Sequence, residues 1–158
     1  MADVSINFKD KAAKKFFKRI LKQSVLVEKK SRIYVNAVVS KHVIKDVTDH
    51  FENQEGGPGK LWPEWSDTYL DHMRKIGKQG NNILTDSARL RNSFGPRKYR
   101  ISSDSITFFN PARTASGFPY AAAHDEGGRK LPQRRFMWLS NKANKKIGQD
   151  TLKFLLKK

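Results

Sequence analysis

The sequence predicts an α+β fold, in which long N-terminal helices and a C-terminal helix pack on a small, mostly antiparallel sheet. Three observations lead to this prediction. Apolar residues recur with a helical period in the first third of the chain and again near its end, and two short runs that suit strands flank a two-residue turn. A chain of 158 residues without internal repeats fits a single domain, residues 1–158, which is long enough to bury a core.

The first third of the chain is predicted to be mainly helical. Residues 3–8 alternate weakly, which suits a short strand or an arm, and we assign residues 1–9 as an arm. An amphipathic helix is expected from Lys11, and a longer one over residues 27–51, where a continuous helical period without Gly or Pro outweighs the β-branched content. The apolar face of the longer helix is predicted to hold Tyr34, Ala37, Val38, Lys41, Ile44, Val47 and Phe51.

Two tryptophans follow the loop over residues 54–59. Trp62 and Trp65 flank a proline, and such indoles usually anchor a loop onto the core, although a platform for stacking bases is the alternative. Ser66 is a good N-cap for a helix that stops at Gly77. A short helix around Leu90 is expected to be capped by Thr85 or Asp86.

The second half of the chain is predicted to supply the sheet. Residues 98–102 and 105–109 suit two strands of a hairpin, and residues 110–119 form a loop rich in Gly, Pro, Ser and Thr that we expect to be flexible. Residues 136–139 suit a further strand. A C-terminal helix is expected from Asn141, and its inner face is predicted to hold Ala143, Ile147, Thr151, Phe154 and Leu155.

The strongest compositional feature is positive charge: 32 Lys and Arg stand against 15 Asp and Glu, a net charge of +17. Residues 1–52 carry 12 basic and 6 acidic residues, residues 53–95 carry 6 and 5, and residues 96–158 carry 14 and 4. This balance favours polyanionic partners. Solvated helix faces that keep the protein soluble explain it equally well.

The absence of cysteine excludes disulfides, thiolate metal sites and cysteine nucleophiles, and it fits a reducing compartment. No apolar run approaches the ~20 residues that span a bilayer, and the N-terminus lacks the layout of a secretory signal. We therefore expect a soluble protein that stays inside a cell and has no membrane partner.

One cluster has the composition of a general acid–base or metal site: His124, Asp125 and Glu126. A metal site would need further ligands at helical spacing, and the other histidines lie beside unrelated neighbours. If the segment is a strand, His124 and Glu126 share one face and Asp125 points to the other. We favour a hydrogen-bonded histidine at the end of the sheet, and we predict no catalytic residue, no metal and no cofactor.

Basic residues follow this cluster. Arg129 and Lys130, after the glycine pair, suit an anion nest or a tight turn, and Arg134 and Arg135 are the best local candidates for phosphate contacts. In the alternative interpretation, which we favour, Phe136 and Trp138 point into the core and the arginines pair with carboxylates of a neighbouring subunit. These four basic residues are our candidates for a subunit interface or a DNA-facing surface.

Several landmarks occur in a recognisable order. They are Phe51, the Gly-Gly-Pro-Gly loop with Trp62, Ser66-Asp-Thr68, the run from Ile83 to Ser93, the hairpin, Tyr120-Ala121, His124 with Gly127, and the turn from Pro132 to Phe136 before the last helix. Over residues 10–155 this series resembles the phage virion morphogenesis family, the tail-completion proteins of tailed bacteriophages and prophages. It is more distantly similar to head–tail joining and tail-terminator proteins.

The resemblance assigns structural roles to ten positions and shows two departures. Ala88 stands where the family often has Gly, and Asp125-Glu126 replaces a more usual polar-then-aromatic pair. The positions with signature roles are Trp62, Trp65, Leu84, Ser87, Leu90, Tyr120, His124, Gly127, Pro132 and Phe136.

The resemblance implies a non-enzymatic structural protein of the virion, assembled in the host cytoplasm. It would form a homomeric ring of six subunits at the neck or at the head-proximal end of the tail. That ring would complete the tail tube, join it to the head connector and contact the packaged DNA non-specifically. A basic nucleic-acid-binding protein is the alternative function.

Overall fold

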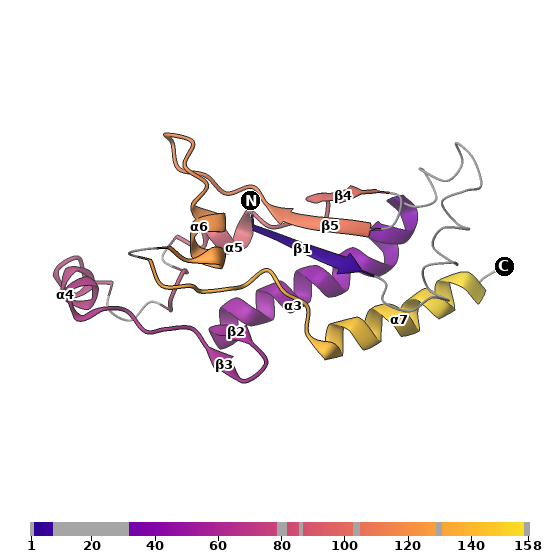
Figure 1. Cartoon of the computed structure of the whole chain (residues 1–158), viewed down its shortest axis with the longest axis horizontal. Coiled ribbons are helices and arrows are strands. Elements are labelled where there is room, and N and C mark those ends of the chain that lie inside the picture. The colour runs from indigo at the N-terminus through magenta and orange to yellow at the C-terminus, as the bar shows by residue number, and fades with distance from the viewer. Residues whose placement is uncertain are drawn as a thin grey trace.

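The computed structural model describes residues 2–7, 32–78, 82–85, 87–102, 105–128 and 131–156, and within them the predicted α+β fold is confirmed (Figure 1). The predicted helix from Lys11, the turn at residues 103–104, Arg129 and Lys130 lie outside the described residues. The elements are β1 (Ala2–Asn7), η1 (Val35–Val39), α3 (Ser40–Asn53), β2 (Glu55–Gly57), β3 (Lys60–Leu61), α4 (Asp67–Lys75), α5 (Arg89–Asn92), β4 (Tyr99–Ile101), β5 (Ser105–Asn110), α6 (Tyr120–Glu126) and α7 (Asn141–Leu156).

The main sheet has three antiparallel strands in the order β1-β5-β4. Of the two readings of the N-terminal residues, the structure shows the strand: β1 pairs with β5 along its whole length, from Ala2 opposite Asn110 to Asn7 opposite Ser105. Along β5 burial alternates, so that Ile106 and Phe108 enter the core. The predicted hairpin strands are confirmed as β4 and β5.

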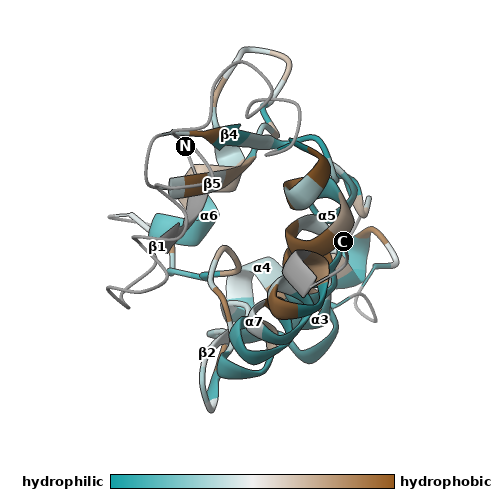
Figure 2. Ribbon diagram, turned by 90° about the vertical axis from the view of Figure 1, so that its right-hand side faces the viewer, coloured by the Kyte–Doolittle hydropathy of each residue, from teal (hydrophilic) through white to brown (hydrophobic). Residues whose placement is uncertain are grey.

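Helices α3 and α7 lie on one side of the molecule and the sheet on the other, with hydrophilic residues along the outer surface of the helices (Figure 2). The two helices pack against each other. Tyr34 lies 2.8 Å from the Thr151 hydroxyl and packs its ring on Phe154. The predicted start of α7 is confirmed, since the Ser140 hydroxyl accepts a hydrogen bond from the Ala143 N–H and so caps the helix.

The predicted apolar face of the long helix is partly wrong. Ala37 and Lys41 are exposed, and the buried residues form a neighbouring stripe. The reason is a π-helical turn over η1, in which the Ser40 N–H donates to the Val35 carbonyl five residues back and thereby shifts the register. The buried apolar residues of this segment are Tyr34, Val35, Val38, Val39, Val43, Val47 and Phe51.

One predicted strand and one predicted position are wrong. His124, which we expected at the end of the sheet, lies on helix α6, so the arrangement considered for a strand, with His124 and Glu126 on one face, does not occur. Residues 136–139 are extended but belong to no strand, because carboxylates of other elements take the place of a neighbouring strand as hydrogen-bond acceptors for this segment. Side chains from other elements therefore hold the segment in place, and strand propensities do not predict such contacts.

Asp150 on α7 joins the two long helices through charge. Its Oδ2 lies 2.7 Å from Lys41 Nζ and 2.9 Å from His42 Nε2, and these contacts hold the pKa of the Asp150 carboxyl below its ordinary value of 3.8. A carboxyl with a lowered pKa in the folded state stabilises the fold above pH 3.8, and this contribution is lost as the pH falls below that value.

Replacement of Asp150 by Asn is therefore expected to lower the melting temperature modestly at pH 7, because the site is partly exposed. The difference between wild type and variant should shrink as the pH is lowered below 3.8. Thermal unfolding followed by circular dichroism from pH 7 to pH 3 measures it. A difference that is the same at every pH would contradict the assigned ion pairs.

Helix α5 begins differently from the prediction. Its N-cap is Ala88, at φ +52°, and not Thr85 or Asp86. A left-handed conformation costs an L-residue about 1–2 kcal/mol, and glycine avoids this cost. The left-handed conformation at residue 88 therefore favours glycine over alanine on steric grounds.

Replacement of Ala88 by Gly is expected to raise the free energy of unfolding by about 0.5–1 kcal/mol, since the relief of steric cost exceeds the added chain entropy. The same change at Ala123, within α6, should lower it by about 1 kcal/mol. Urea denaturation of both variants gives the comparison. Destabilisation by Ala88→Gly would show that the left-handed turn carries no steric cost.

Candidate functional site

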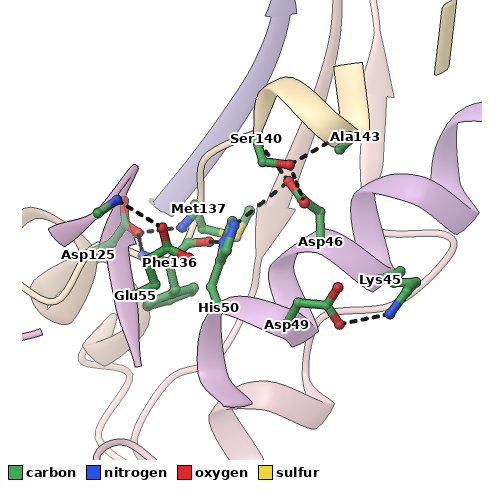
Figure 3. A network of polar contacts seen from close by, with 11 residues as sticks. Lys45, Asp46, Asp49, His50, Glu55, Asp125, Phe136, Met137, Ser140 and Ala143 are labelled. Atoms are coloured by element: carbon green, nitrogen blue, oxygen red, sulfur yellow. Dashed lines mark hydrogen bonds and ion pairs between the residues drawn. The ribbon is translucent and has the colours of Figure 1, made fainter. Parts of the chain in front are cut away.

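The segment over residues 131–140 is the centre of the site, and contacts from helices α6 and α3 fix its path (Figure 3). From α6, Asp125 Oδ1 accepts hydrogen bonds from the N–H groups of Phe136 and Met137, both at 2.7 Å. From α3, Asp46 accepts from the Ser140 N–H at 2.7 Å and from its hydroxyl at 2.6 Å. The N–H groups of Phe136, Met137 and Ser140, which no neighbouring strand pairs, thereby have acceptors.

A histidine and a tryptophan add to this attachment. His50 Nδ1 lies 3.0 Å from the Phe136 carbonyl oxygen, and the imidazole stacks on Trp138 with ring centroids 4.0 Å apart. Phe136 and Trp138 are buried, as the sequence predicted. His50 and Asp46 were not predicted as functional residues, because on a helix they look like ordinary polar positions and their partners lie far away in the sequence.

The Asp125 carboxyl has a structural role. Asp125 is buried, and burial raises the pKa of its carboxyl above the ordinary value of 3.8, while the two N–H donors oppose that rise. Its neighbours on α6 point elsewhere, since successive helical residues diverge by about 100°. The three side chains from His124 to Glu126 therefore do not converge, and the described part of the chain contains no group of three or more His, Cys, Asp or Glu residues placed to hold a metal ion.

Gly127 ends α6 at a point where no other residue fits. Its φ of +74° and ψ of −176° lie in a region that is essentially limited to glycine. A Cβ there would lie 2.9 Å from the Cβ and 3.0 Å from the Cα of Gln133. Residues 131–134 thus pack closely against the end of α6, and the Arg134 N–H donates to the His124 carbonyl at 2.8 Å.

The tryptophan loop is attached to the same segment. Trp62 is buried, and its indole N–H donates to the Arg135 carbonyl at 2.8 Å, as expected of an anchoring indole. The Arg134 guanidinium donates at 3.0 Å to the carbonyls of Pro63 and Glu64. Its side chain is 5% exposed, so it holds this loop within the chain and does not lie on the outer surface.

The other candidate basic residues have different positions. Arg135 is exposed and remains a candidate for contact with a partner. Arg129 and Lys130 lie outside the described residues, and their proposed role stays a prediction.

A groove of about 900 Å³ is lined by residues of α4, α5, α6 and the 131–134 segment. These three helices lie at the end of the molecule away from α7 (Figure 1). The groove brings together most of the signature positions, which are spread over about 70 residues of sequence. Trp62, Gly127 and Phe136 are not among its lining residues. The signature residues that line it are Trp65, Leu84, Ser87, Leu90, Tyr120, His124 and Pro132.

Asn110 positions the α5 wall of the groove and was missed by the sequence analysis. It is buried at the end of β5, where its Nδ2 donates to the Leu90 carbonyl at 3.0 Å and its Oδ1 accepts from the Ser93 hydroxyl at 2.7 Å. The Ala112 N–H donates to the same Oδ1 at 3.0 Å. A buried amide with these bonds fixes α5 to the sheet.

The loop that follows Asn110 projects from the body of the molecule (Figure 1). It closes on itself: the Thr114 N–H donates to the Phe118 carbonyl at 2.9 Å, and Arg113 Nη1 donates to the Gly117 carbonyl at 2.8 Å. The loop contributes Thr114 and Ala115 to the groove. The predicted flexibility of residues 110–119 stays a prediction.

None of the helices in the described residues is both long enough and apolar enough to cross a membrane. No curated protein and no solved structure matches the chain. The model of the phage virion morphogenesis family matches residues 8–156, which is nearly the whole length of the chain. The chain therefore belongs to the phage virion morphogenesis family.

Proposed function

We propose that the protein is a ring-forming subunit at the neck or head-proximal end of a phage tail, where six copies complete the tail tube and join it to the head connector. The observation that carries this proposal is the family match over residues 8–156, which makes the protein a virion-associated structural component of a bacteriophage and suggests no enzymatic role. The position in the tail and the ring go beyond that match.

The sheet supports self-association. Its outer strands, β1 and β4, each pair only with β5 among the described strands, so each has one edge without a strand partner there. Such edges are normally covered or shared with another chain, and a closed ring of identical subunits offers a neighbour at every edge. Exposed Arg135 is our candidate for contacts with acidic partner surfaces.

Assembly with purified tail tubes tests the proposal. The protein, freed of nucleic acid, should form a discrete oligomer by native mass spectrometry and cap tube ends in electron micrographs. Replacement of Arg135 by Glu should weaken capping at least severalfold, while the same change at exposed Lys145 on α7 should not. A monomer that ignores tube ends would overturn the proposal.

A basic nucleic-acid-binding protein is the second candidate, and the net charge of +17 favours it. Under this function free duplex DNA binds tightly, with an affinity that falls steeply as salt is raised. Fluorescence anisotropy at 50 and 200 mM salt separates the two functions, since a tail ring subunit should bind free DNA weakly at both.

A further inference from the structure

The groove combines apolar side chains with a few charged ones, namely exposed Glu64 and Arg89 and buried Arg134. Leucine, proline and aromatic residues make up the apolar part of its lining: Trp65, Tyr69, Leu84, Leu90, Tyr120, Leu131 and Pro132. Arg134 and His124 also line it. A groove of this composition binds ligands through apolar burial and takes its specificity from a few polar groups.

Arg134 is a buried cation without a counter-charge among the described residues. Its Nε and Nη2 donate to two backbone carbonyls, but its Nη1 forms no hydrogen bond to a described residue, and no described carboxylate lies within ion-pair distance. Glu64 supplies only its carbonyl, and its own side chain is exposed. Buried charges in proteins are normally paired, because desolvation of a lone ion is costly.

His124 adds a second unmet polar group at the same place. Its Nδ1 is buried and has no hydrogen-bond partner among the described residues. Burial lowers the pKa of His124, and the charge of Arg134 lowers it further, so that the imidazole is neutral near pH 7. A neutral imidazole can donate one hydrogen bond beside the guanidinium without adding a second charge.

We propose that this groove binds an extended acidic peptide segment of a partner protein, with one carboxylate held by Arg134 and flanking apolar residues packed on the groove walls. Arginine and carboxylate form strong, geometrically defined pairs, so one acidic side chain would neutralise the buried charge. A nucleic-acid backbone needs several exposed cations, and of the two arginines that line the groove only Arg89 is exposed, whereas Arg134 is 5% exposed.

The inference deepens the proposed function, because the partner would be a neighbouring protein of the virion. Its test needs neither phage particles nor ring assembly. If no peptide binds, the proposed tail function is not affected. If the protein fails to cap tail tubes, the proposed peptide site in the groove is not affected.

Selection of peptides from a displayed random library on the purified full-length chain tests the proposal. Enriched sequences should share one Asp or Glu between apolar residues. In a synthetic copy, replacement of that acidic residue by its amide should weaken binding about tenfold or more, as measured by fluorescence anisotropy. Enrichment of basic sequences, of sequences without a carboxylate, or of none would overturn the proposal.

Two tryptophan variants locate the binding site. Ser87→Trp fills the groove from an exposed position and should abolish binding, whereas Gln149→Trp, on the exposed face of α7, should leave it unchanged. This pair avoids replacing Arg134, whose loss would also release the loop at residues 63 and 64. Equal binding by both variants would exclude the groove.

Two further outcomes would assign a different ligand to the groove. Competition by a single-stranded oligonucleotide for the same site would assign the groove to nucleic acid. Enriched sequences that match a segment of this chain, together with an oligomer that Ser87→Trp dissociates, would assign it to a second copy. Either result overturns the proposal of an acidic partner segment.

Discussion

Replacement of Asp125 by Ala should lower the free energy of unfolding by about 3–5 kcal/mol. The change leaves the buried N–H groups of Phe136 and Met137 without their acceptor, and each buried donor that loses a charged partner costs about 1.5–3 kcal/mol. Phe136 and Met137 belong to the segment that also supplies Arg134 to the groove lining. Peptide binding should therefore be lost as well. Urea denaturation followed by tryptophan fluorescence measures the loss of stability.

Asparagine at the same position provides a matched control. Both hydrogen bonds end on a single oxygen, Oδ1, so the amide oxygen can accept both and the loss should stay below about 1.5 kcal/mol. Asp71→Ala, at an exposed ion pair with Arg74, should change stability by less than about 0.5 kcal/mol. If Asn is as damaging as Ala, the acceptor role of Oδ1 is wrong.

The pH dependence of the asparagine variant has a defined sign. Burial raises the pKa of Asp125 in the folded protein above 3.8, so the folded state binds more protons than the unfolded state just above that pH. The stabilising contribution of protonated Asp125 is complete below pH 3.8 and is lost as the pH rises through the raised pKa. Wild type should therefore lose stability relative to Asp125→Asn over that range, as seen in unfolding curves from pH 3 to 7.

Replacement of Gly127 by Ala should cost about 3–5 kcal/mol. The residue would be forced into a backbone region that costs about 1–3 kcal/mol, and its new methyl would lie 2.9–3.0 Å from side-chain and backbone atoms of Gln133. Relief of that overlap would move the 131–134 segment off α6 and break the hydrogen bond from the Arg134 N–H to the His124 carbonyl. Differential scanning calorimetry gives the loss directly.

The neighbouring glycine isolates this effect. At Gly128 a Cβ would meet no atom within 4 Å, so Gly128→Ala should change stability by less than about 1 kcal/mol. The two variants carry the same chemical change at adjacent positions of the same turn. Similar losses at both would mean that the turn as a whole, and not the contact with Gln133, makes alanine unfavourable.

Part of the site could be predicted from residues close together in the sequence. Ser66 accepts a hydrogen bond from the Tyr69 N–H and caps α4, as its type and position predicted, and the indole of Trp62 found an acceptor. The triplet from His124 to Glu126 was recognised as unusual, but its role was not. Asp125 binds residues 11 and 12 positions later, and no spacing rule assigns a carboxylate to that task.

By itself, the sequence determined the α+β class, the hairpin and the helix starts at Ser66 and Asn141, because these depend on neighbours within a few residues. The sequence as a whole also determined the family. Only the tertiary structure decided that Asp46, Asn110 and Asp125 act as buried acceptors, and that seven of the ten predicted signature positions line one groove together with buried Arg134. The reason is physical: a buried polar group takes whichever partner the fold brings within hydrogen-bond distance, and that partner is set by packing between elements far apart in the chain.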